Sequence, residues 1–259
     1  MRGEAAAAST TEDAVLGGRL VLRQPRRGHR VGHDAILLAA ATGAAAGEHA
    51  VDLGAGVGAA GLALAARVPG LSVTLVEIDA ALVVLAADNI RRNRLDDRAR
   101  AVVLDAAAPA RAFAAAGLAP GSAACVLMNP PFNDRAARHA SPDPARRLAH
   151  VAAPGGLAPW LRSAARLLAP RGRLTLIWRA DGLAEVLAAL APGFGAPTVQ
   201  PVHPRPDAAA IRVLVRAVKA SRTPLALLPA LVLADADGRP SVQAEAVLRH
   251  GVALPLADL

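Results

Sequence analysis

Apolar residues gather along the chain in short runs that alternate with longer alanine-rich or amphipathic stretches. Seven runs are typical of buried strands, because they are short, apolar and bounded by turn residues: 49–56, 72–79, 99–106, 124–131, 172–180, 198–202 and 211–219. The stretches between them predict helices at 36–46, 61–68, 80–93, 158–169 and 183–191. This alternation indicates an α/β fold with a doubly wound, mostly parallel, seven-stranded sheet.

A single domain accounts for nearly all of the chain. We expect it to span residues 14–259, with a C-terminal extension, 223–259, that contains a turn signal at 235–238 and a short helix near Glu245. The acidic, alanine-rich residues 1–13 are expected to be disordered, because they offer too little apolar surface to fold.

The charge of the chain favours an anionic partner. Its 259 residues include 29 Lys and Arg against 21 Asp and Glu, a formal net charge of +8 that favours nucleic acid. The N-terminus lacks the apolar core of a signal peptide, and no uninterrupted apolar stretch is long enough to span a membrane. We therefore expect a soluble, cytoplasmic protein. One cysteine and seven scattered histidines give no reason to expect a metal site.

The first expected strand runs into a glycine-rich turn, where open α/β sheets bind their ligands. Gly56, Gly58 and Gly61 satisfy the GxGxxG pattern of dinucleotide-binding proteins, although a glycine-rich chain can match it by chance. Glu77 ends the second strand, where its carboxylate can accept hydrogen bonds from both hydroxyls of a ribose. Since NAD and S-adenosylmethionine both contain such a ribose, these residues leave both cofactors open.

The fourth expected strand ends on Asn-Pro-Pro-Phe, residues 129–132. The exocyclic amine of adenine is a poor nucleophile, because its lone pair is delocalised into the ring. Two fixed acceptors, the Asn129 side chain and the Pro130 carbonyl, can take both of its hydrogens and free that lone pair. Phe132 offers a ring on which a flipped-out base can stack. The motif indicates a reaction at a planar amine or amide nitrogen, which adenine, guanine and glutamine all possess.

Taken in order, these elements resemble class I S-adenosylmethionine-dependent methyltransferases, which have a Rossmann-like fold. The resemblance implies that Glu77 binds the ribose and that Asp105, at the end of the third strand, contacts the adenine amine. It implies catalytic roles for Asn129, Pro130 and Phe132. The cofactor-binding residues that it implies are Asp52, Gly54, Ala55, Gly56, Gly58, Glu77, Ile78, Asp105 and Ala106.

The segments on either side resemble one subgroup, the bacterial tRNA(Val) adenine-N6 methyltransferases. The resemblance rests on Val-Gly-His-Asp-Ala-Ile-Leu-Leu at 31–38 and on the C-terminal tail, and it implies tRNA as the substrate. That subgroup often has Tyr where Phe132 stands. An arginine-rich segment follows the motif and forms either a phosphate-binding track or a solvated loop; its candidate residues are Arg135, Arg138, Arg146 and Arg147.

Two other functions compete with methylation of tRNA. Glutamine N5 methyltransferases of proteins also use an Asn-Pro-Pro-aromatic motif, but they usually carry a helical substrate domain for which the N-terminal segment is too short. A nicotinamide-dependent oxidoreductase would explain GxGxxG and leave residues 129–132 unexplained.

Four further residues are assigned structural roles. Asp79 and Asp34 each precede an apolar helical stretch and are expected to be N-caps. Trp160 and Trp178 are expected to be core aromatics.

Overall fold

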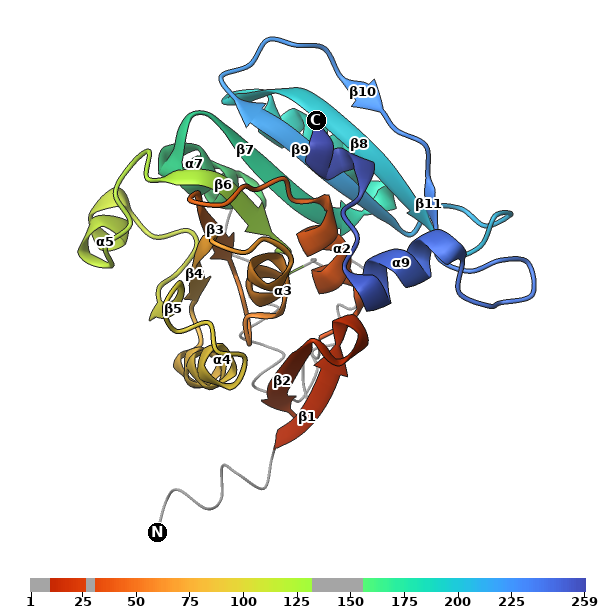
Figure 1. Cartoon of the computed structure of the whole chain (residues 1–259). Helices are drawn as coiled ribbons and strands as arrows, with labels where there is room; N and C mark the ends of the chain where they lie inside the picture. Colours follow the sequence, from red (N-terminus) through yellow and green to blue (C-terminus); the bar gives the residue numbers. More distant parts are fainter. Residues whose placement is uncertain (1–9, 27–30, 132–155) are drawn as a thin grey trace, which may run out of the picture.

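A central β-sheet organises the molecule (Figure 1). The structure is a computed structural model, and it describes residues 10–26, 31–131 and 156–259. All seven strands expected from the sequence are present: β3 (His49–Leu53), β4 (Ser72–Glu77), β5 (Ala99–Val103), β6 (Ala123–Met128), β7 (Leu168–Arg179), β8 (Phe194–His203) and β9 (Arg212–Lys219). The expected α/β fold with a mostly parallel sheet is confirmed.

The first strand of this sheet along the sequence, β3, lies inside the sheet and not at its edge. The order is β5-β4-β3-β6-β7-β9-β8, and β9 is antiparallel to both of its neighbours. Two short strands that the sequence did not suggest, β10 (Ala226–Leu227) and β11 (Leu231–Val232), extend this sheet beside β8. Because β3 lies between β4 and β6, the chain reverses its direction of winding there, which is where such sheets bind ligands.

Helices cover both faces of the sheet, as alternating strands and helices require. The helices that the structure describes are α2 (His33–Ala41), α3 (Ala59–Arg67), α4 (Ala80–Arg92), α5 (Ala110–Ala115), α7 (Ala158–Leu167), α8 (Leu183–Leu190) and α9 (Val242–His250). One buried apolar cluster combines α2, α3 and α4 with one face, and a second combines α5, α7 and α8 with the other. Neither face of the central strands is open, which explains why their sequences are continuously apolar.

The N-terminal segment forms a hairpin that the sequence analysis missed. Strands β1 (Thr10–Val15) and β2 (Leu20–Pro25) pair antiparallel through the short 3-10 turn η1 (Leu16–Gly18). The prediction of disorder was therefore wrong for residues 10–13, which belong to β1; residues 1–9 lie outside the described part of the chain. Leu20 and Leu22 are fully buried, so this hairpin adds apolar side chains to the core.

Two asparagines, Asn89 in α4 and Asn93 at its C-cap, hold the hairpin by its backbone. Asn89 accepts a hydrogen bond from the Arg23 N–H at 2.7 Å and donates to the Arg23 carbonyl at 3.0 Å. Asn93, one helical turn later, makes the same pair of bonds to Val21 at 2.9 and 2.8 Å. Asn89 is fully buried. It also donates to the carbonyl of Val57 at 3.0 Å, in the glycine-rich turn that follows β3, residues 54–58, called the glycine turn below. One side chain therefore joins the hairpin, α4 and the glycine turn.

The C-terminal segment returns to the main body. Helix α9 is capped by Ser241, whose hydroxyl accepts from the Ala244 N–H at 3.0 Å, and it contacts α2 and η1. Among the described residues, no helix combines the length and the apolar character needed to cross a bilayer.

Replacing Asn89 by Ala should destabilise the fold strongly. The change leaves the Arg23 N–H and the Arg23 and Val57 carbonyls without these partners, and each buried polar group left unpaired costs about 1–3 kcal/mol. We expect a loss of about 2–4 kcal/mol in urea-induced unfolding. Asn93→Ala is the matched control, with a smaller loss because Asn93 is only half buried. Equal losses in both variants would contradict the special position of Asn89.

Candidate functional site

The parallel register of three strands brings the expected site residues together. Leu53, the last residue of β3, is paired with Val76 of β4 on one side and Met128 of β6 on the other. The next residue of each strand or turn is therefore at the same edge: Glu77, Gly54 and Asn129. Residues that are far apart in the sequence form one row at the carboxyl end of the sheet.

The glycine turn after β3 needs glycine for its backbone conformation. Gly54, Gly56 and Gly58 have φ angles of 72°, 57° and 91°, a region in which side chains are strained. The N–H groups of Gly54 and Ala55 both donate to the Val76 carbonyl, at 2.8 and 2.9 Å, which ties the turn to the end of β4. At Gly56 nothing lies within 4 Å of the position that a Cβ would occupy, so the turn borders open space there.

Glu77 faces the glycine turn across the end of β4. Its Oε2 accepts a hydrogen bond from the Gly56 N–H at 2.8 Å, and its Oε1 accepts from the Asp79 N–H at 2.9 Å. Each oxygen of a carboxylate has two acceptor positions. The two backbone bonds therefore fix the carboxylate while leaving it able to accept two hydroxyl hydrogens.

Asp52 is buried inside the protein, next to the glycine turn. It is 2% exposed, and its Oδ2 accepts from the Gly61 N–H of α3 at 2.8 Å. Burial raises the pKa of this carboxyl to about 7, an effect to which the nearby negative charge of Glu77 adds and which the Gly61 bond opposes. Asp52 thus joins β3 to the first turn of α3 and supports the turn from inside.

On the other side of Glu77, apolar side chains are exposed at the same edge. Ile78 is 53% exposed, and Val103, which is paired with Glu77 in register, is 56% exposed. Asp105 is also exposed and accepts from the Ala107 N–H at 2.8 Å, while Ala106 is buried. Sequence analysis missed Val103. Exposed apolar residues beside polar ones form a surface suited to a flat aromatic ring with polar edges.

Asn129 and Pro130 place two hydrogen-bond acceptors directly after β6. Among the described residues, none hydrogen-bonds the half-buried Asn129 side chain, and no N–H donates to the carbonyl of the buried Pro130. The Asn129 side chain is partly accessible and the Pro130 carbonyl has acceptor capacity, so both can accept hydrogen bonds from a ligand at this edge. Phe132 and the candidate substrate-binding residues Arg135, Arg138, Arg146 and Arg147 lie outside the described residues.

Of the two expected helix caps, one is correct. Asp79 is the N-cap of α4 and accepts from the Ala81 N–H at 2.8 Å. The prediction for Asp34 was wrong: the N-cap of α2 is Gly32, and Asp34 lies in the first turn. Its Oδ2 instead accepts a hydrogen bond from Nε of Arg212 at 2.9 Å, an ion pair that joins α2 to the start of β9. Arg212 is 178 positions away from Asp34 in the sequence, so the residues around Asp34 could not have indicated this ion pair.

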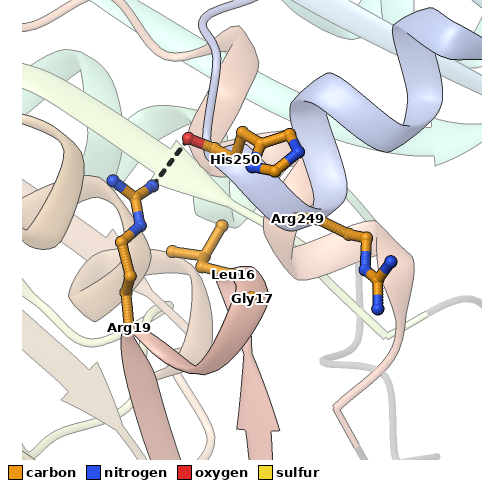
Figure 2. A pocket seen from close by; sticks show the side chains of 5 residues that line it. All are labelled: Leu16, Gly17, Arg19, Arg249 and His250. Atoms are coloured by element: carbon orange, nitrogen blue, oxygen red, sulfur yellow. Dashed lines mark hydrogen bonds between the residues drawn. The ribbon is translucent and has the colours of Figure 1, made fainter.

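A surface cavity of about 420 Å³ lies elsewhere, between η1 and the end of α9 (Figure 2). Its lining residues are Leu16, Gly17, Arg19, Arg249 and His250, none of which belongs to the sheet edge described above. Figure 2 shows that the two arginines point in different directions. Arg19 donates to the His250 carbonyl at 2.7 Å and so caps α9, and Arg249 is paired with Glu245. The arginines of this cavity therefore have structural partners.

Comparison with known proteins identifies the family. A family model described as the methyltransferase small domain matches residues 30–199, most of the chain. Protein Atu636 from Agrobacterium tumefaciens, whose structure is described as that of a predicted O-methyltransferase, is 30% identical, covers 85% of this chain and 97% of its own, and has a TM-score of 0.71. The chain belongs to the methyltransferase small domain family.

A more distant structure shows the same fold. TYW2 of P. horikoshii, in complex with MeSAdo, is 13% identical over 82% of this chain and 72% of its own, with a TM-score of 0.52. No curated protein matches the sequence.

Membership of this family selects methyl transfer over the nicotinamide-dependent reaction, so the cofactor is S-adenosylmethionine, as the sequence predicts. The residues at the sheet edge fit that molecule. Glu77 keeps acceptor positions for a ribose diol, Gly56 borders open space, and Ile78 and Val103 expose apolar surface for an adenine ring. In the described part of the chain, no group of three or more His, Cys, Asp or Glu is arranged to hold a metal ion.

Replacing Glu77 by Ala should weaken S-adenosylmethionine binding at least about tenfold. Hydrogen bonds to a charged group contribute about 1.5–3 kcal/mol each, and about 1.4 kcal/mol is a factor of ten. Calorimetric titration measures the change. Glu245→Ala removes an exposed carboxylate of α9 and is the matched control, with unchanged affinity. Equal affinity in wild type and Glu77→Ala would remove Glu77 from the site.

Asp52 should make stability depend on pH in the absence of cofactor. Because its folded pKa of about 7 lies above the unfolded value near 3.9, the folded state binds more protons between these pH values. Stability should therefore fall by about 1.4 kcal/mol per pH unit as pH rises from 4 to 7, and level off above. Asp52→Asn keeps an acceptor for Gly61 and should remove this slope in urea unfolding. The same slope in both proteins would refute the assignment.

Proposed function

We propose that this chain transfers the methyl group of S-adenosylmethionine to an exocyclic amine of a nucleobase, namely adenine N6 in tRNA. The observation that supports this most directly is a pair of acceptors beside Gly54 at the end of β3, the Asn129 side chain and the Pro130 carbonyl, to which none of the described residues donates. An amine with two hydrogens matches two fixed acceptors, one hydrogen for each.

The chemistry follows from this geometry. S-adenosylmethionine supplies an electrophilic methyl group on a positively charged sulfur. With both hydrogens held by Asn129 and Pro130, the amine nitrogen directs its lone pair at the methyl carbon. The carbon–nitrogen bond forms as the carbon–sulfur bond breaks, which leaves a neutral thioether, and the cationic nitrogen then loses one proton to water. The protein contributes position and electrostatic stabilisation rather than a strong base.

Charge supports RNA as the partner. The net charge of +8 suits a phosphate backbone, whereas a glutamine side chain in a protein substrate gives no reason for it. The description of Atu636 as an O-methyltransferase raises a hydroxyl as another acceptor. A hydroxyl offers a single hydrogen, so it would leave one of the two acceptors at residues 129 and 130 unpaired.

Labelled methyl transfer to several acceptors tests the proposal. Unmodified tRNA, total protein and single-stranded DNA are incubated side by side with the protein and labelled S-adenosylmethionine. The tRNA products are digested to nucleosides and separated. We expect label in tRNA as N6-methyladenosine. Label in ribose-methylated nucleosides would establish a hydroxyl acceptor instead, and label in N5-methylglutamine would establish a protein substrate.

Asn129→Ala tests the role of the side-chain acceptor. Its bond to the amine strengthens as positive charge develops on nitrogen, and loss of one such contact costs about 2.7–4 kcal/mol, or a factor of 10²–10³ in rate. We expect kcat on tRNA to fall by this factor. Affinity for S-adenosylmethionine should remain within about threefold, because Glu77 and the glycine turn are intact. A variant that keeps more than about a tenth of wild-type kcat would refute the paired-acceptor mechanism.

A further inference from the structure

Trp160 lies against the glycine turn. It belongs to the first turn of α7, and its six-membered ring approaches Gly54 so closely that a Cβ there would lie 2.5 Å from Cη2 and 2.8 Å from Cζ3. The contact leaves no room for a side chain at Gly54. This is a second reason for glycine there, in addition to its positive φ angle. The contact also places an indole at the edge that carries the cofactor and acceptor residues.

The two tryptophans differ in their surroundings. Trp178 is 8% exposed and lies in the buried cluster of β7, as expected of a core aromatic. Trp160 packs against the same cluster but is only partly buried, and its indole N–H has no hydrogen-bond partner among the residues described. Tryptophans with one apolar and one accessible side are typical of binding surfaces. The expectation of a core role is therefore incomplete for Trp160.

The register of the strands defines what lies beside Trp160. Gly54 lies between Glu77 on β4 and Asn129 after β6, because Leu53 is paired with Val76 and Met128. A ribose held at Glu77 and an amine held at Asn129 must be joined across the end of β3. The sulfur that carries the methyl group is the link between them, so it passes over Gly54, the residue that Trp160 contacts.

We propose that the indole of Trp160 forms the wall of the cofactor pocket at Gly54 and binds the positively charged sulfur of S-adenosylmethionine. This rests on the proposed function, since the position of the sulfur depends on an acceptor at Asn129. An aromatic ring attracts a desolvated cation but has no such attraction for a neutral thioether. Trp160 thus favours the charged methyl donor over S-adenosylhomocysteine, the neutral product, and assists product release.

Fluorescence locates the ligand relative to each tryptophan, because the chain contains only two. In Trp178→Phe, Trp160 is the single emitter, and S-adenosylmethionine should change its emission with the dissociation constant found by calorimetry. In Trp160→Phe, which retains Trp178, the emission should stay constant while calorimetry still shows binding. A constant signal from Trp160 during binding would overturn the proposal.

Affinity for the charged and neutral ligands tests the role of the ring. We expect Trp160→Leu to weaken S-adenosylmethionine about three- to tenfold and S-adenosylhomocysteine less than twofold, with Trp160→Phe between Leu and wild type. Equal weakening of both ligands would mean that Trp160 only supports Gly54. If wild-type protein bound neither ligand, the proposed function itself would fail, an outcome distinct from failure of the Trp160 assignment.

Discussion

The site depends on one constraint, the register of β3 between its two parallel neighbours. Because Leu53 is opposite both Val76 and Met128, the strands β3, β4 and β6 end at the same level of the sheet. Two bonds from the Gly54 and Ala55 N–H groups to the Val76 carbonyl hold the glycine turn at this level. A slip of one residue would reverse the side chains of β3 between the two cores and separate Glu77 from the turn.

Two carboxylates at this turn have different roles because their surroundings differ. Asp52 is buried and bonded to α3, and its burial favours the protonated form. Glu77 is also largely buried, with 9% exposed, but two backbone N–H groups hold its carboxylate at the end of β4 and leave acceptor positions on both oxygens. The Asp52 carboxyl supports the turn, and the Glu77 carboxylate is the one that can accept hydrogen bonds from a ligand.

Local patterns in the sequence predicted most of the fold. The apolar runs identified all seven strands of the main sheet, and the residues before an apolar helix identified the cap at Asp79. Interactions between distant residues were not predictable. The hairpin of β1 and β2 is held by Asn89 and Asn93, 66–72 positions away, and its own sequence shows no clear alternation. The ion pair of Asp34 and the contact of Trp160 with Gly54 also join distant segments.

The central claim is that a single sheet edge holds both the methyl donor and the amine that receives the methyl group. A crystal structure of the protein with S-adenosylhomocysteine and adenosine monophosphate tests this claim most directly. The account predicts the ribose hydroxyls of S-adenosylhomocysteine on Glu77 and the exocyclic amine of the nucleotide between the Asn129 side chain and the Pro130 carbonyl. A cofactor bound away from Glu77, or a nucleotide that leaves both acceptors unpaired, would contradict it.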